Sequence, residues 1–199
     1  VAVVRKMWAL AYKYGYKGGN ILEPSVGTGE FLAFAPPHSN ITGFEISEHS
    51  ATICSILYPQ ANIIVEPFEK QFIGKNNVTL KDKIEPKYDL VIGNPPYGSF
   101  DVVKSRFMYM GEDKFTEAKN YAEYFMRRSM DLLKPNGLLI FIIGASIEGG
   151  GTLFLDSGLT PVKEYLAEHC ELLDAYRLPD AVFERTGVTS EIIVLQKKA

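Results

Sequence analysis

Short apolar segments alternate along the whole chain with segments of helical periodicity, and this alternation constrains the fold more than any other feature of the sequence. The apolar segments are rich in strand-forming residues, whereas most of the segments between them carry apolar residues at the spacing of amphipathic helices. The predicted strands are residues 20–23, 41–44, 63–66, 89–92, 138–143, 172–178 and 192–196, and the predicted helices are residues 1–12, 30–35, 47–58, 116–133 and 160–169. This order predicts an α/β fold with a doubly wound, mostly parallel seven-stranded sheet flanked by helices.

The length and the charge of the chain limit its organisation and its partners. Its 199 residues correspond to a single domain, residues 1–199, without an internal repeat or linker. The chain begins without an initiator methionine or a capping residue, so we predict that this domain is cut from a longer polypeptide. With a formal net charge of −3 it has no overall basic surface, and DNA binding would depend on a local patch or on additional domains.

The sequence contains no targeting segment and no membrane-spanning segment. Its longest apolar run, residues 138–143, is far too short to cross a bilayer. Cys54 and Cys170 are single and far apart, which favours reduced, core-filling cysteines over a metal site. We therefore expect a soluble, cytoplasmic protein that binds no metal and is monomeric as an isolated domain.

The helix predicted over residues 116–133 carries a stripe of aromatic and aliphatic side chains. Such a stripe is more typical of core packing than of ligand binding. Arg127 and Arg128 are expected on the solvated face of this helix.

The four residues after Gly93 cannot continue any regular structure. Residues 94–97 read Asn-Pro-Pro-Tyr, and the two prolines remove two N–H donors and fix two φ angles. They also restrict the residue before each of them, including Asn94. The result is a stiff corner that holds a side-chain amide, carbonyl oxygens and an aromatic ring together, which suits a flat ring with an amino group. An ordinary Asn-Pro turn is the alternative, but the corner follows a central apolar strand.

A second polar segment follows the first predicted strand and contains Glu23, Gly27 and Gly29. The glycines allow a tight turn that a ligand can approach closely. Glu45 ends the second predicted strand, 22 positions after Glu23, where acidic residues bind ribose hydroxyls in doubly wound folds. The segment lacks the third glycine of a dinucleotide fingerprint and the lysine of a phosphate loop. A carboxylate at Glu23 suits an ammonium group, and a ribose with an α-amino group is the outline of S-adenosylmethionine. A surface role for Glu45 is the alternative.

Taken in this order, the segments resemble those of the amino-directed DNA methyltransferases, specifically the N6-adenine enzymes of restriction–modification type. The resemblance is carried by Glu23-Pro24-x-x-Gly27-x-Gly29-x-Phe31, Gly43-Phe44-Glu45-Ile46, Asn94-Pro95-Pro96-Tyr97, and Val182-Phe183 followed by Val188-Thr189. These segments span nearly the whole chain, and their combination is far more specific than any one of them. The order of the segments is that of enzymes whose target-recognition domain follows the catalytic domain, and residues 1–199 contain no such domain.

The resemblance implies roles for individual residues. It assigns S-adenosylmethionine to Glu23, Pro24, Ser25, Gly27, Gly29, Phe31, Glu45, Ile46, Glu66 and Phe68, methyl transfer to Asn94, Pro95, Pro96 and Tyr97, and the target base to Tyr97 and Phe183. One position departs from the family pattern, because Pro67 stands before Phe68 where the family has an acidic residue. Either Glu66 or Glu69 would then contact the adenine of the cofactor.

The activity that the resemblance implies is methyl transfer to the exocyclic N6 of adenine in DNA. The side-chain oxygen of Asn94 and the carbonyl of Pro95 would hold the two amino hydrogens and direct the nitrogen lone pair at the methyl group. A base in a duplex must first be flipped out. Three alternatives stay open, namely methylation of a protein glutamine side chain, methylation of an RNA adenine, and a non-catalytic cofactor-binding module of a larger protein.

Overall fold

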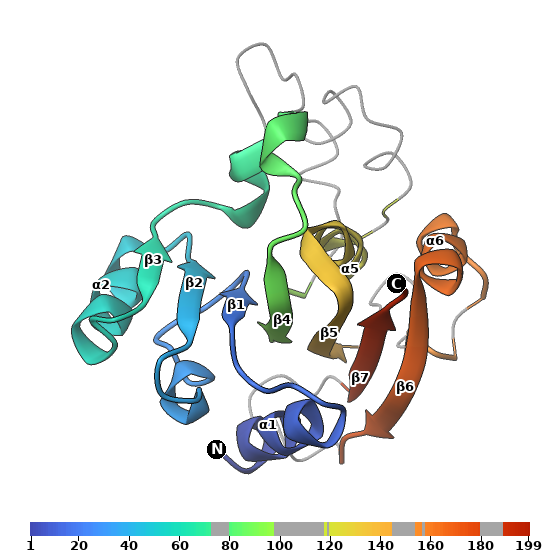
Figure 1. Cartoon of the computed structure of the whole chain (residues 1–199), viewed down its shortest axis with the longest axis horizontal. Coiled ribbons are helices and arrows are strands. Elements are labelled where there is room, and N and C mark those ends of the chain that lie inside the picture. The colour runs from blue at the N-terminus through green and yellow to red at the C-terminus, as the bar shows by residue number, and fades with distance from the viewer. Residues whose placement is uncertain (73–79, 98–117, 119, 145–153, 157, 180–188) are drawn as a thin grey trace.

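The computed structural model describes the chain apart from residues 73–79, 98–117, 119, 145–153, 157 and 180–188. At its centre is a seven-stranded sheet of order β3-β2-β1-β4-β5-β7-β6 (Figure 1). The strands are β1 (Asn20–Glu23), β2 (Asn40–Phe44), β3 (Asn62–Ile64), β4 (Tyr88–Gly93), β5 (Leu133–Gly144), β6 (Cys170–Arg177) and β7 (Ser190–Lys197). Among these strands, the pairs β5–β7 and β7–β6 are antiparallel and the other four pairs are parallel. This confirms the predicted mostly parallel sheet.

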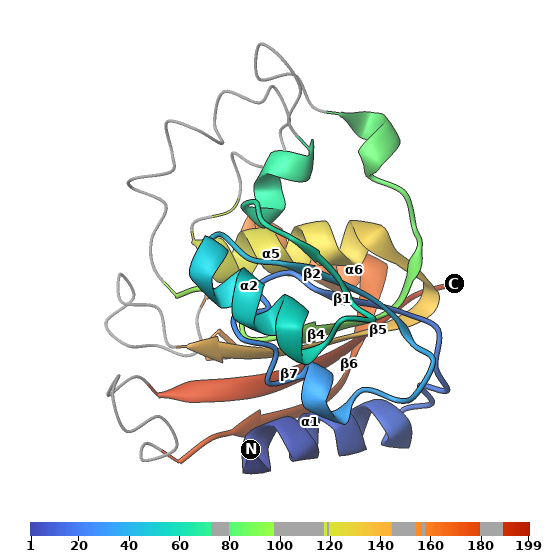
Figure 2. The ribbon, with the colours of Figure 1, turned by 90° about the vertical axis from the view of Figure 1, so that its left-hand side faces the viewer.

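Helices cover both faces of the sheet. Figure 2 shows α1 (Ala2–Lys13) on one face and α5 (Tyr121–Leu132) and α6 (Pro161–His169) on the other. The helix α2 (Glu48–Leu57) contributes Cys54 to the core on the α1 side, whereas Cys170 lies in the core on the α5 side. Both cysteines are buried and free, as predicted. In the part of the chain that the structure describes, no helix combines the length and the apolar character needed to cross a membrane.

Two predicted elements differ in the structure. The helix predicted over residues 30–35 is only a short 3₁₀ turn, η1 (Leu32–Phe34), because Ala35 is extended before Pro36 and a proline disfavours helical backbone at the preceding residue. Residues 134–137, which separate a predicted helix from a predicted strand and read as a turn in the sequence, lie inside β5 as a bulge, in which Asn136 has a φ of 63°. Two further 3₁₀ turns, η2 (Phe68–Phe72) and η4 (Lys81–Lys83), were not predicted.

The prediction for the two arginines of α5 is wrong. Arg128 is only 2% exposed, and its guanidinium lies 4.7 Å from the ring centroid of Phe72 and 3.2 Å from the carboxylate of Asp131. Arg127 lies 4.1 Å from the ring centroid of Tyr165, which belongs to α6. Both side chains therefore contact neighbouring elements, because aromatic rings and a carboxylate supply partners that the helical pattern alone does not reveal.

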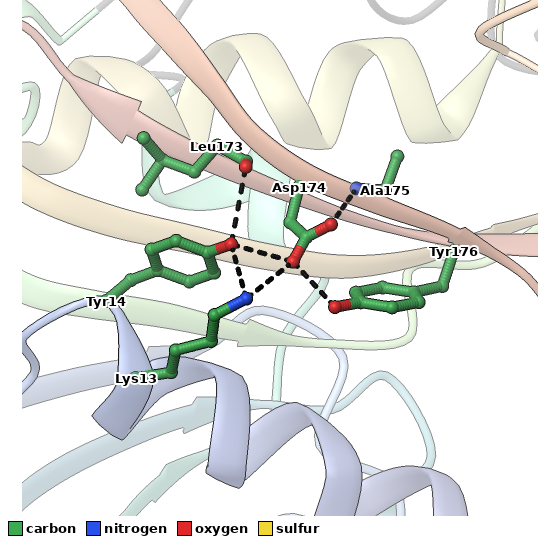
Figure 3. Close-up of polar contacts among 6 residues, drawn as sticks. All are labelled: Lys13, Tyr14, Leu173, Asp174, Ala175 and Tyr176. Atoms are coloured by element: carbon green, nitrogen blue, oxygen red, sulfur yellow. Dashed lines mark hydrogen bonds and ion pairs between the residues drawn. The ribbon is translucent and has the colours of Figure 1, made fainter.

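A cluster of polar side chains joins the end of α1 to the edge strand β6 (Figure 3). The hydroxyls of Tyr14 and Tyr176 donate hydrogen bonds to one oxygen of Asp174, at 2.7 and 2.6 Å, and the ammonium of Lys13 lies 3.2 Å from the same oxygen. The other oxygen accepts the N–H of Ala175. The hydrogen bonds from Tyr176 and Tyr14 hold the pKa of Asp174 well below its usual range. This carboxylate therefore anchors α1 to the sheet.

Candidate functional site

The strand order reverses between β1 and β4, and the two predicted motifs follow these two strands. The chain passes from β1 to β2 on one side and from β4 to β5 on the other. Open α/β sheets bind ligands at the carboxyl ends of the strands at such a reversal. Glu23 is the last residue of β1, and Asn94 directly follows Gly93, the last residue of β4. The structure therefore places the predicted cofactor and catalytic motifs side by side at the carboxyl ends of β1 and β4.

Gly93 fits the two motifs together. A Cβ atom at this position would lie 3.3 Å from Cγ and 3.9 Å from Oε1 of Glu23, and 3.8 Å from Cδ of Pro24. The missing side chain thus leaves space for the carboxyl group of Glu23 beside the residue that precedes Asn94. This role of Gly93 was not predicted from the sequence. A glycine at the very end of a buried strand is the feature that could have revealed it, because such a residue often marks close approach of another group.

The turn after β1 depends on two glycines with left-handed φ angles, 56° for Gly27 and 90° for Gly29. A Cβ atom on Gly27 would meet nothing within 4 Å, whereas one on Gly29 would lie 2.5 Å from the ring of Tyr58 and 2.9 Å from the sulfur of Cys54. Gly29 therefore lets the turn lie against α2, and the open space at Gly27 lets a ligand approach the backbone.

Glu45 fastens this turn to the end of β2. One oxygen of its carboxylate accepts the N–H of Gly27 at 2.9 Å, and the other accepts the N–H of Ser47 at 2.8 Å. Each carboxylate oxygen can accept a second hydrogen bond. Glu45 therefore keeps the capacity to accept hydroxyl groups of a ribose that lies over Gly27.

Glu23 has the opposite environment. It is only 1% exposed, and among the described residues its Oε2 atom has no hydrogen-bond partner. Burial, followed by the nearby negative charges of Glu30 and Glu45, raises the pKa of Glu23 well above its ordinary value. A buried carboxyl group without a partner suits a ligand that brings both positive charge and N–H donors. The α-ammonium group of S-adenosylmethionine fits this requirement.

The corner after β4 is held by a hydrogen bond within the motif. The hydroxyl of Tyr97 donates to Oδ1 of Asn94 at 2.6 Å. Burial raises the pKa of Tyr97 to about 12, so its hydroxyl remains a donor at neutral pH. The oxygen predicted to accept the amine of the substrate is thus hydrogen-bonded to the residue predicted to stack on the base. Pro95 is buried, and Pro96 is half-buried.

Two predicted cofactor residues lie at the ends of the outer strands. Ile46, directly after Glu45, is 74% exposed and offers an apolar surface beside the turn. Glu66 follows β3, and its two oxygens lie 3.4 Å from Nζ of Lys70 and 2.9 Å from the amide nitrogen of Gln71.

Two predicted aromatic residues lie deeper in the molecule. Phe68 is only 2% exposed, and its ring packs against those of Phe44 and Phe125 at centroid distances of 5.5 and 5.0 Å, so it belongs to the core. Phe31 is also buried, and its carbonyl accepts the indole N–H of Trp8 at 2.9 Å.

The remaining predicted residues complete the site. Pro24 and Ser25 form the first part of the turn after β1. Phe183, with the rest of residues 182–188, lies outside the described residues. Within the described ranges, no group of three or more His, Cys, Asp or Glu side chains is placed to hold a metal ion.

The sheet order and its helices define the fold of S-adenosylmethionine-dependent methyltransferases. A solved structure from Listeria monocytogenes, described as a class I S-adenosylmethionine-dependent methyltransferase, superposes with a TM-score of 0.67 at 16% identity, over 98% of this chain and 58% of its own. Residues 39–154, more than half of the chain, match the Eco57I restriction-modification methylase family. The chain belongs to this family, which uses S-adenosylmethionine. The matched range includes Glu45 and residues 94–97.

Two relatives illustrate the similarity. The "Defense against restriction protein B" of Escherichia phage P1 is 30% identical over 197 residues, which cover 98% of this chain and 8% of the relative. "Modification methylase CviBIII" of Paramecium bursaria Chlorella virus NC1A is 30% identical over 135 residues, which cover 65% of this chain and 32% of the relative. The chain therefore spans less than a third of the length of either protein.

Proposed function

We propose that this domain transfers the methyl group of S-adenosylmethionine to the exocyclic N6 of adenine in DNA. The observation that carries the proposal is the position of Glu23 beside the start of the Asn-Pro-Pro-Tyr corner, across a glycine without a side chain. A buried carboxyl group whose Oε2 has no partner among the described residues thus lies next to the strand end that carries an amide acceptor for the substrate. Membership of a restriction-modification methylase family supports DNA as the substrate.

The residues of the turn and of the neighbouring strand ends would hold the cofactor. Glu23 would bind the ammonium group, Glu45 would accept the ribose hydroxyls, and the backbone at Gly27 would lie against the ligand. Ile46 would contact the adenine ring, and Glu66 would reach its amino group. When bound, the cofactor supplies an electrophilic methyl group. In the arrangement described above, Phe68 would support this surface from within the core.

The corner after β4 would position the target amine. Oδ1 of Asn94 and the carbonyl oxygen of Pro95 would each accept a hydrogen bond from one N–H group of the amine. Pro96 would keep this corner rigid. Oδ1 keeps a second lone pair for the amine while it accepts the hydroxyl of Tyr97, which would orient the amide of Asn94. The ring of Tyr97 would stack on the flipped base. Phe183 would contact the edge of that base.

Direct transfer to the amine needs no nucleophile from the protein. Burial raises the pKa of both Cys54 and Cys170 to about 11, so neither is a thiolate at neutral pH. This supports a mechanism in which the domain contributes positioning and electrostatics. Sequence specificity would come from additional domains, in line with the short share of the relatives that this chain covers.

The test is product analysis after incubation with labelled S-adenosylmethionine. The protein that contains this chain is mixed separately with unmethylated DNA, RNA and a cellular protein extract, and the products are digested to nucleosides or amino acids. Label in N6-methyladenine from DNA supports the proposal. Label found only in RNA adenine or only in methylglutamine would show that RNA or protein, rather than DNA, is the substrate. The absence of label from every product would favour a non-catalytic module.

Asn94→Ala tests the mechanism. The variant loses an acceptor that acts mainly in the transition state, so kcat should fall by about 100-fold or more while the cofactor dissociation constant stays within about threefold. Asn40→Ala is the matched control, because Asn40 is the first residue of β2 and so lies at the amino-terminal end of the strands, away from the site at their carboxyl ends. Normal kcat in Asn94→Ala would rule out the proposed mechanism.

A further inference from the structure

We propose that binding of the amino-acid part of S-adenosylmethionine is coupled to the release of one proton from Glu23. The α-ammonium group would replace this proton as the partner of the buried carboxyl. The inference rests on the proposed cofactor site and adds that the free and bound forms of the protein differ by one proton at this residue.

The geometry around Glu23 favours a neutral carboxyl group in the free protein. Glu23 is the last residue of β1, and its side chain packs against Gly93 of the neighbouring strand β4 and is 1% exposed. Its Oε2 atom is buried and without a hydrogen-bond partner among the described residues. A carboxylate at this position would have neither exposure to water nor, among the described residues, a hydrogen-bond donor at Oε2 to stabilise its charge, and this disfavours the charged form.

The neighbouring elements add to this effect. Glu30 lies in the turn after β1, and Glu45 directly follows β2. The negative charges of both residues oppose ionisation of Glu23. From α2, Cys54 and Tyr58 lie close enough for the charge of Glu23 to raise their pKa values in turn. The adjacent residue on β4 is Gly93, which carries no charge. Among the residues that the structure describes, the groups named here are acidic or neutral, and burial, followed by the charges of Glu30 and Glu45, raises the pKa of Glu23.

The comparison with Glu45 shows which ligand group would reverse this preference. Glu45 receives two backbone N–H groups, from Gly27 and Ser47, whereas no described donor reaches Oε2 of Glu23. An α-ammonium group brings positive charge and N–H donors together, which favours the carboxylate. Its own pKa lies above neutrality, so it arrives already protonated. The proton that leaves on binding therefore comes from Glu23.

Calorimetry with S-adenosylhomocysteine measures this proton directly. The binding enthalpy is recorded in buffers of different ionisation enthalpy, from about pH 5 to about pH 8, and its slope against the buffer enthalpy gives the number of protons released. We expect release to approach one proton per ligand where Glu23 is protonated in the free protein. In that range the affinity should fall by up to about tenfold for each unit of decreasing pH.

The matched ligand is 5′-methylthioadenosine, which keeps the adenosine part and lacks the amino acid. Its binding should release no proton at Glu23, and its affinity should not follow the same pH dependence. Equal proton release with both ligands would overturn the proposal, because the ammonium group would then have no part in it. Binding of S-adenosylhomocysteine without proton release would also overturn it, although the cofactor site would stand. Failure to bind at any pH would contradict the proposed cofactor site and the coupling together.

Two variants locate the proton. Glu23→Gln should abolish the release, since the amide does not titrate in this range. Glu30→Gln changes an exposed residue and removes a negative charge near Glu23, so it should shift the pH profile of release to lower pH without abolishing it. This second variant keeps the test decisive if Glu23→Gln does not fold. A profile in Glu30→Gln that coincides with that of the wild type would count against the cluster of carboxyl groups as its cause.

Discussion

Replacing Gly29 by alanine should destabilise the domain through two separate effects that the structure allows one to estimate. The residue has a φ of 90°, which costs an L-amino acid about 1–2 kcal/mol. Its added Cβ would lie 2.5 Å from the ring of Tyr58 and 2.9 Å from the sulfur of Cys54, so both must move. Overpacking of this kind costs about 1–3 kcal/mol. The total is a loss of roughly 2–5 kcal/mol.

Gly15→Ala is the matched control for the backbone effect. Gly15 has a φ of 96°, but a Cβ atom there would meet nothing within 4 Å. It should therefore lose only about 1–2 kcal/mol. In a domain of this size 1 kcal/mol corresponds to about 2–4 °C, so Tm should fall by roughly 2–8 °C in Gly15→Ala and by roughly 4–20 °C in Gly29→Ala.

Chemical and thermal unfolding of both variants, without ligand, compares the two losses. In Tyr58→Ala the ring is absent, so adding Gly29→Ala to that background should cost about 1–2 kcal/mol less than in the wild type. Equal destabilisation by Gly29→Ala and Gly15→Ala would refute the contact with α2 as a constraint on this turn. An unchanged cost in the Tyr58→Ala background would refute the ring as its cause.

Three further substitutions address the site and the anchor of α1. Tyr97→Phe keeps the ring and removes the hydrogen bond that orients the amide of Asn94, so kcat should fall roughly two- to tenfold at unchanged KM for DNA, and an unchanged kcat would contradict this orienting role. Glu45→Ala should weaken S-adenosylhomocysteine binding by about tenfold or more in calorimetry, and equal affinity would remove Glu45 from the ribose site. Asp174→Asn should lower Tm near neutral pH. Because the pKa of Asp174 is lowered in the folded state, the ionised carboxylate stabilises the fold fully above its pKa in the unfolded chain, about 3.9. The Tm difference between the variant and the wild type should therefore shrink as the pH falls below that value.

Local chemistry made the sheet and both motifs predictable. Apolar runs that end at a glycine or a proline identify strands, and a mostly parallel sheet then brings their carboxyl ends to one edge. Glu23, Glu45 and Asn94 could therefore be predicted at or just after the ends of three strands, and the structure confirms these positions. Their roles toward a cofactor and a base remain predictions.

What the sequence did not predict depends on contacts between residues distant along the chain. Arg128 looked like a surface residue of a helix, yet η2 supplies the ring of Phe72 above its guanidinium. Phe68 was assigned to the cofactor adenine by position, yet rings from β2 and α5 enclose it. Helical periodicity gives the direction of a side chain but not the element that will lie opposite.

The two acidic residues of the site show how topology separates chemically equivalent side chains. Glu23 and Glu45 each stand at the carboxyl end of a strand, and their sequence contexts do not distinguish their protonation. Glu23 is the last residue of β1 and still pairs with Gly43 of β2, and its side chain is only 1% exposed. Glu45 lies just beyond β2, where the chain turns and leaves the N–H groups of Gly27 and Ser47 available. One carboxylate is thus hydrogen-bonded by the protein and organises the turn, while the other keeps a buried oxygen without a partner among the described residues, which we propose a cationic ligand would satisfy. The position of each residue relative to the end of its strand, rather than its identity, decides whether backbone N–H groups of the turn reach its carboxylate.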